Sequence, residues 1–99
     1  MPITIINVDE SHPEWPVVTL SSVPVPAWAD AFNAYCDWAK GSPAPDGVPP
    51  EVTFPTVAKE TEIKLTRDQI HLHMRPPGTS YVHISAFIDE AIAYANSRI

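Results

Sequence analysis

The clearest hydrophobic pattern is an alternation over residues 61–75. Apolar and polar side chains alternate in Thr61–Thr66 and again in Gln69–Arg75, which is the two-residue period of a half-buried strand. With Arg67 and Asp68 as the turn, the pattern predicts a β-hairpin with the pairs Leu65–Ile70, Ile63–Leu72, Lys64–His71, Glu62–His73 and Glu60–Arg75. A four-residue type I turn competes with this arrangement, because Arg-Asp is not a preferred two-residue turn.

Two segments have a helical period instead. Pro26 suits the first position of a helix and Gly41 suits the residue after its end, so a helix is predicted between them. Its apolar stripe comprises Trp28, Ala31, Phe32, Tyr35, Cys36 and Ala39, with Trp38 at the edge. A second helix is predicted from about Ser85, as N-cap, to about Arg98. Its apolar stripe is Ile84, Phe87, Ile88, Ala91, Ile92, Ala95 and Ile99, and its polar side is Asp89, Glu90, Asn96 and Ser97.

The remaining strand signals are shorter. Ile3–Val8 and Val17–Leu20 are apolar and β-branched, and we expect them to form a hairpin around a loop stiffened by proline. Glu51–Phe54 is predicted as a short edge strand, and Tyr81–His83 as a strand before the last helix. The fold class expected for residues 1–99 is one α+β domain, a small antiparallel sheet of four to five strands with two amphipathic helices packed on one face.

The acidic charge of the chain limits the kinds of partner that it can bind. The chain has 99 residues and a formal net charge of −6, and residues 1–58 carry seven acidic side chains against Lys40 alone. Because binding to nucleic acid needs clustered Lys and Arg, direct contact with nucleic acid is not expected. The sequence has no long apolar span and no basic, apolar leader, and Cys36 is its single cysteine. We therefore expect a cytoplasmic protein with no membrane segment and no internal disulfide.

Few residues suggest catalysis. His71 and His73 lie two apart on a predicted strand and so share one face, where they could bind a metal ion together with His83. The alternation by itself also accounts for polar residues at both positions. Cys36 lies on the apolar stripe late in a helix, where a core thiol is expected rather than a nucleophile. We find no nucleophile elbow and no glycine-rich phosphate loop, so the sequence predicts no catalytic residue and no cofactor.

The features that remain point to binding. Trp15 in a stiff loop, Trp38 at the edge of a helical stripe and Tyr81 beside a turn are candidate exposed aromatic anchors, and the acidic residues Asp9, Glu10 and Glu14 surround the first of them. Trp15 could instead fold back as a lid over the core.

The sequence thus favours a small acidic protein-binding module without enzymatic activity, which occupies a surface of a larger, basic partner. Immunity proteins, antitoxins and phage anti-defence inhibitors such as anti-CRISPR proteins are analogous classes. Two alternatives stay open, a metal-binding protein or small metalloenzyme using His71, His73 and His83, and a virion or assembly component. The sequence leaves the oligomeric state open.

Overall fold

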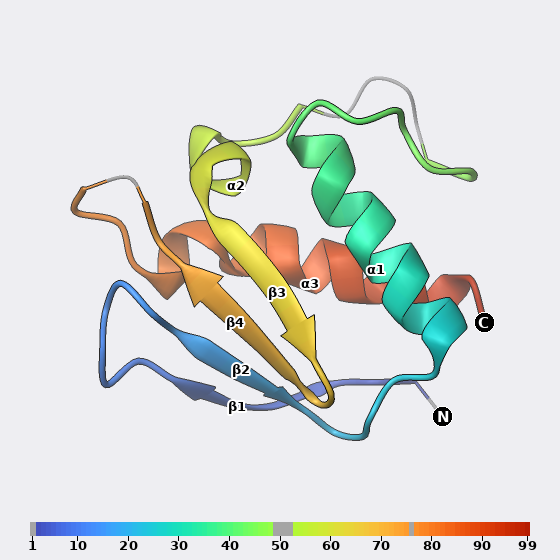
Figure 1. Ribbon diagram of the computed structural model, residues 1–99, viewed down its shortest axis with the longest axis horizontal. Helices are drawn as coiled ribbons and strands as arrows, with labels where there is room; N and C mark the ends of the chain where they lie inside the picture. Colours follow the sequence, from blue (N-terminus) through green and yellow to red (C-terminus); the bar gives the residue numbers. More distant parts are fainter. Residues whose placement is uncertain (1, 49–52, 76) are drawn as a thin grey trace.

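In the described residues, four antiparallel strands and three helices form the α+β fold expected from the sequence. The computed structural model describes residues 2–48, 53–75 and 77–99. The elements in chain order are β1 (Ile5–Asp9), β2 (Val17–Leu20), α1 (Pro26–Ala39), α2 (Thr56–Glu60), β3 (Glu62–Thr66), β4 (Gln69–His73) and α3 (Tyr81–Ser97). The strands lie in the order β1-β2-β4-β3, so the two hairpins meet through β2 and β4 at the centre of the sheet. The helices gather on one side of this sheet, with α3 running behind it in Figure 1.

The predicted register of the second hairpin is confirmed from Glu62–His73 to Leu65–Ile70. Thr66 pairs with Gln69, so Arg67 and Asp68 are the two turn residues and the type I alternative is wrong. The predicted pair of Glu60 with Arg75 is also wrong. Glu60 belongs to α2, and Arg75 bonds to Glu62 instead.

Both predicted helical stripes face the core. The six stripe residues of α1 are buried or partly buried, and Trp38 lies partly buried at the edge. The α3 stripe is buried from Ile84 to Ala95, but Ile99 lies beyond the helix and is 67% exposed. The core between helices and sheet is centred on fully buried side chains that include Val18, Leu20, Trp28, Phe32, Ile70, Leu72, Ile84 and Ile88.

The short edge strand predicted at Glu51–Phe54 is not formed by the part of it that the structure describes. In the segment predicted as an edge strand, Glu51 and Val52 lie outside the described residues, and Thr53 and Phe54 are not in a strand. The chain instead forms α2 after Pro55, which buries Val57 and Ala58.

The last helix starts at Tyr81 rather than at Ser85, so Tyr81–His83 is its first turn and not a strand. The reason is the N-cap, because the Ser80 N–H donates to Nδ1 of His83 at 3.0 Å.

Candidate partner-binding face

The described helices leave one face of the sheet uncovered (Figure 1). Residues paired across an antiparallel sheet project to the same side, and successive residues along a strand project to opposite sides. The buried pair Val18 and Ile70 faces the core, so the residues next to them along each strand face outward. We call the outward set the open face. It comprises Asn7 and Asp9 on β1, Trp15, Val17 and Thr19 on and before β2, Gln69, His71 and His73 on β4, and Glu62, Lys64 and Thr66 on β3.

Trp15 is fixed on the open face by the ladder between β2 and β4. The Met74 N–H donates to the Glu14 carbonyl at 2.8 Å and the Leu72 N–H donates to the Pro16 carbonyl at 3.0 Å, so Trp15 lies directly opposite His73. The two rings stack with centroids 3.9 Å apart and planes 11° apart. Trp15 is nevertheless 50% exposed, and it lies outside the sheet, so the expectation of a lid over the core is wrong.

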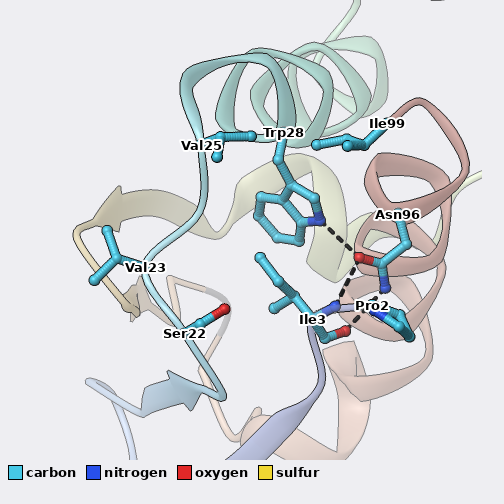
Figure 2. A pocket seen from close by; sticks show the side chains of 8 residues that line it. All are labelled: Pro2, Ile3, Ser22, Val23, Val25, Trp28, Asn96 and Ile99. Atoms are coloured by element: carbon cyan, nitrogen blue, oxygen red, sulfur yellow. Dashed lines mark hydrogen bonds between the residues drawn. The ribbon is translucent and has the colours of Figure 1, made fainter.

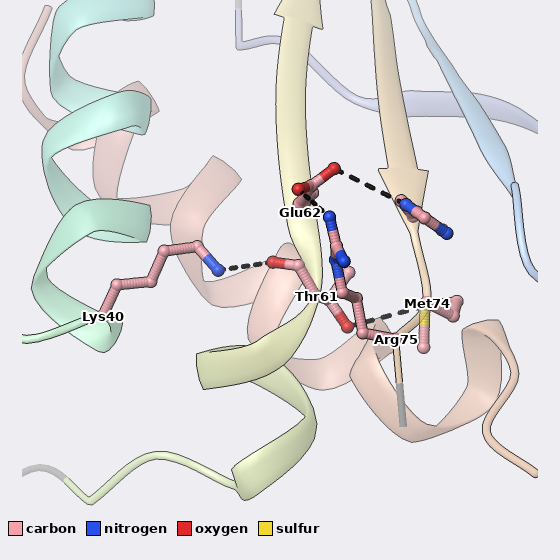
Figure 3. Close-up of polar contacts among 6 residues, drawn as sticks. Lys40, Thr61, Glu62, Met74 and Arg75 are labelled. Carbon is pink, nitrogen blue, oxygen red and sulfur yellow. Dashed lines mark hydrogen bonds and ion pairs between the residues drawn. The ribbon is translucent and has the colours of Figure 1, made fainter. Parts of the chain in front are cut away.

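His73 connects the tryptophan to an ionic group on β3. Its Nδ1 lies 3.5 Å from Oε2 of Glu62, and Glu62 also bonds to the Arg75 guanidinium (Figure 3). The hydrogen bond from Arg75, together with that cation's charge, lowers the pKa of the Glu62 carboxyl. This end of the open face therefore carries a continuous row of rings and charges from Trp15 to Arg75.

The acidic residues that precede Trp15 in the sequence are exposed. Asp9, Glu10 and Glu14 all have exposed side chains. The Ser11 hydroxyl and N–H both donate to Oδ1 of Asp9, and these hydrogen bonds lower the pKa of its carboxyl. Asp9 thus holds its negative charge with neutral donors, so its charge is not cancelled locally.

The other two candidate anchors lie elsewhere. Tyr81 is 9% exposed and packs in the core, so its expected exposure is wrong. Burial raises the pKa of its phenol to about 12, and the nearby carboxylates of Asp89 and Glu10 add to that rise. Trp38 is partly buried and packs edge-on against Phe54, with ring centroids 4.7 Å apart. Of the three aromatic residues, Trp15 is therefore the one presented to solvent.

The histidines are not arranged as a metal centre. His71 and His73 share the outer side of β4 as predicted, but Nδ1 of His83 is occupied by the N-cap of α3. Within residues 2–48, 53–75 and 77–99, no group of three or more His, Cys, Asp or Glu side chains could hold a metal ion.

Cys36 is a core thiol, as the sequence predicts. It is 4% exposed, and burial, with a smaller effect of Asp37, raises the pKa of its thiol to about 12. A thiol with that pKa is not a thiolate near neutral pH, so nothing here activates it as a nucleophile.

A pocket of about 460 Å³ lies between the start of the chain, the start of α1 and the end of α3 (Figure 2). Its polar wall is Asn96, whose Oδ1 accepts from Trp28 Nε1 at 2.8 Å and from the Ile3 N–H at 2.9 Å. The Nδ2 of Asn96 donates to the Ile3 carbonyl at 2.8 Å. Because these bonds engage both polar atoms of Asn96, the residue holds β1 to the helices rather than presenting itself to a ligand. Its predicted place on the polar side of α3 did not indicate this role.

Comparisons with known proteins give no relative for this chain. No protein-family model matches it, and no curated protein and no solved structure matches it significantly. In the described parts of the chain, no helix has the length and apolar character needed to cross a membrane. The open face is thus the basis for a functional proposal.

Proposed function

We propose that this protein is a binding module that occupies a surface of a larger, basic protein partner without catalysing a reaction. Trp15 is the observation that carries the proposal, because it is half exposed yet held flat against His73. A tryptophan that is already ordered loses little conformational freedom on binding, and such residues dominate the binding energy of interfaces. Inhibitors and immunity-type proteins act by this kind of surface occupation.

Charge supports a basic partner. The chain carries a net charge of −6, Asp9 ends β1, and Glu10 and Glu14 lie in the loop that leads from β1 to Trp15. A field of one sign beside an aromatic anchor steers an oppositely charged surface toward that anchor and raises the association rate.

The test is capture of a partner by matched variants. Tagged wild-type protein, Trp15→Ala and the double variant Glu10→Lys/Glu14→Lys are incubated with lysate of the cells that make the protein, and captured proteins are quantified by mass spectrometry. We expect one stoichiometric partner for the wild type, and at least about a tenfold loss for both variants, as for an interface hot spot.

The two control variants make the same kinds of change, a double charge reversal and the loss of an exposed apolar side chain, away from Trp15. Asp30→Lys/Asp37→Lys alters two exposed carboxylates on α1 and changes the net charge equally, and Val82→Ala removes an apolar side chain that is 71% exposed. Both controls should capture the partner as the wild type does. Equal capture by all five proteins would show that the Trp15 region is not the binding surface.

A further inference from the structure

The backbone of β2 determines which way the backbone of β1 faces. In an antiparallel ladder, alternate residues turn their N–H and C=O groups to opposite neighbours. The Leu20 N–H donates to the Asp68 carbonyl at 2.7 Å, and Pro16 accepts from Leu72, so the even-numbered residues of β2 face β4. Val17 and Thr19 therefore face β1.

Val8 consequently directs its backbone away from the sheet. The β1 partners of Val17 and Thr19 are Asp9 and Asn7, which face back toward β2, and Val8 lies between them. Since β1 is the last strand on its side of the sheet among the described residues, the Val8 N–H and C=O point out along an edge that no described strand covers. A donor and an acceptor on one residue are what an added antiparallel strand pairs with.

The sequence of β1 does little to obstruct such pairing. Its five residues include no proline and no lysine, which are common protective residues on edge strands. Ile6, next to the β-bulge between Ile5 and Asn7, is 63% exposed. The bulge disturbs the first half of the strand and leaves Asn7–Asp9 in regular register with β2.

Charge selects the occupant of this edge. Residues 1–39 contain no lysine or arginine, and Asp9 projects from the edge strand onto the open face, followed by Glu10. A second copy of the chain would bring two acidic edges together, which like-charge repulsion disfavours. An extended segment with Lys or Arg at alternate positions would place cations beside Asp9.

We propose that the β1 edge accepts an extended, Lys- or Arg-bearing strand of the partner protein, which pairs with Val8 and extends the sheet. This inference rests on the proposed function and names the mode of binding. It is continuous with Trp15, because β1 leads through residues 10–14 to Trp15. The main chain would provide affinity, and the acidic side chains would select the basic segment.

The first test removes one outward N–H from each edge of the sheet. Val8→Pro removes the donor on β1, and Leu65→Pro is its matched control on β3. Like Val8, Leu65 is partly buried and faces the core. It lies between Lys64 and Thr66, which pair with β4, so its N–H points away from the sheet as that of Val8 does. In the capture assay above, Val8→Pro should lose about tenfold in captured partner, since a main-chain hydrogen bond is removed, and Leu65→Pro should lose none. Circular dichroism checks that both variants keep the fold.

A second test uses the unmodified protein and so does not depend on a proline variant folding. The probe is a six-residue peptide that alternates Lys with Thr, and its control alternates Glu with Thr. NMR amide exchange should slow at Val8, with shift changes over residues 7–10, on addition of the Lys peptide and not of the Glu peptide. Absence of any change at Val8 would overturn the inference.

The outcomes separate the two proposals. If Trp15→Ala abolishes capture and Val8→Pro does not, the binding function stands and the edge inference fails. If neither variant affects capture, neither Trp15 nor the β1 edge is part of the binding surface, and if the wild type captures no partner, the binding function fails. If light scattering shows a dimer and NMR exchange shows that its Val8 amide is protected, the occupant of the edge is a second copy of the chain. The proposed basic strand is then wrong.

Discussion

The two edge strands, β1 and β3, are tethered to helices in similar ways but protected in different ways. At β1, Asn96 of α3 bonds to the N–H and C=O of Ile3, just before the strand. At β3, the Lys40 ammonium after α1 bonds to the carbonyl of Thr61 (Figure 3). It also bonds to the carbonyl of Lys59 at 3.2 Å. Both edges are thus fixed by a polar side chain that binds main-chain atoms.

Protection against a foreign strand differs. β3 carries Glu62 and Lys64, has Lys59 and Arg67 on either side of it, and packs beside α1. Mixed charges and a neighbouring helix are devices that keep an edge strand unpaired. β1 has no cation, and among the described elements its contacts are with β2 and with no helix. An edge strand can thus be well anchored within its own fold and still be available to pair with another chain.

The largest predicted effect comes from replacing the two side chains that hold the edge strands to the helices. Asn96→Leu leaves the Trp28 indole N–H and both backbone groups of Ile3 without their partner in a partly buried place, so the free energy of unfolding should fall by about 3 kcal/mol. Lys40→Met removes bonds in a more exposed place and should cost about 1 kcal/mol. Urea unfolding measures both values.

The control for the tethers is Asn33→Leu, on the exposed side of α1. It should change the free energy of unfolding by less than about 0.5 kcal/mol, as surface substitutions usually do. If Asn96→Leu were as mild as this control, β1 would not depend on Asn96 for its position.

A smaller effect on stability is predicted at the hairpin turn that follows β3. Arg67 has a φ of +54°, a left-handed conformation that favours glycine, at the first position of the hairpin turn. Arg67→Gly should therefore raise the free energy of unfolding by about 0.5 kcal/mol, the strain relieved less the added flexibility of the unfolded chain. Asp68→Gly, at the next position without a positive φ, should lower it by a similar amount. The same sign for both in thermal unfolding would contradict this account of the turn.

The elements predicted correctly from the sequence are those specified by neighbouring residues. The alternation in residues 61–75 determines its own register, since a slip by one position would turn Ile70 and Leu72 to solvent. The helical stripes likewise follow from local spacing. The errors arise where the local signal is short, as at Thr56–Glu60, or where the capping partner is the unusual His83 in place of Glu or Gln.

Only part of the candidate site could be predicted. The exposure of Trp15 and of Glu14 follows from a polar, proline-rich loop. The partner of Trp15 does not, because His73 meets it only through the pairing of β2 with β4, two strands far apart in the chain. Asn96 escaped prediction for the same reason, since its partners Ile3 and Trp28 are 93 and 68 positions away.

The smallest predicted effect compares one carboxylate on each edge. Asp9 on β1 and Glu62 on β3 both have a lowered pKa, Asp9 through Ser11 and Glu62 first through Arg75. A lowered pKa means that folding favours the ionised form. Each carboxylate therefore supports the fold above its ordinary pKa, and this support is lost as the pH falls through the folded value.

The causes can be separated by salt and by substitution, with NMR titration of the side-chain carboxyl carbons as the measurement. Because ionic attraction is screened and a neutral hydrogen bond is not, about 0.5 M NaCl should raise the pKa of Glu62 toward its ordinary value more than that of Asp9. Arg75→Gln should raise only the pKa of Glu62, and Ser11→Ala only that of Asp9. An equal response of both groups to salt would mean that the charge of Asp9 is also paired. The β1 edge would then lose the uncompensated charge that distinguishes it from β3 and that selects a basic strand.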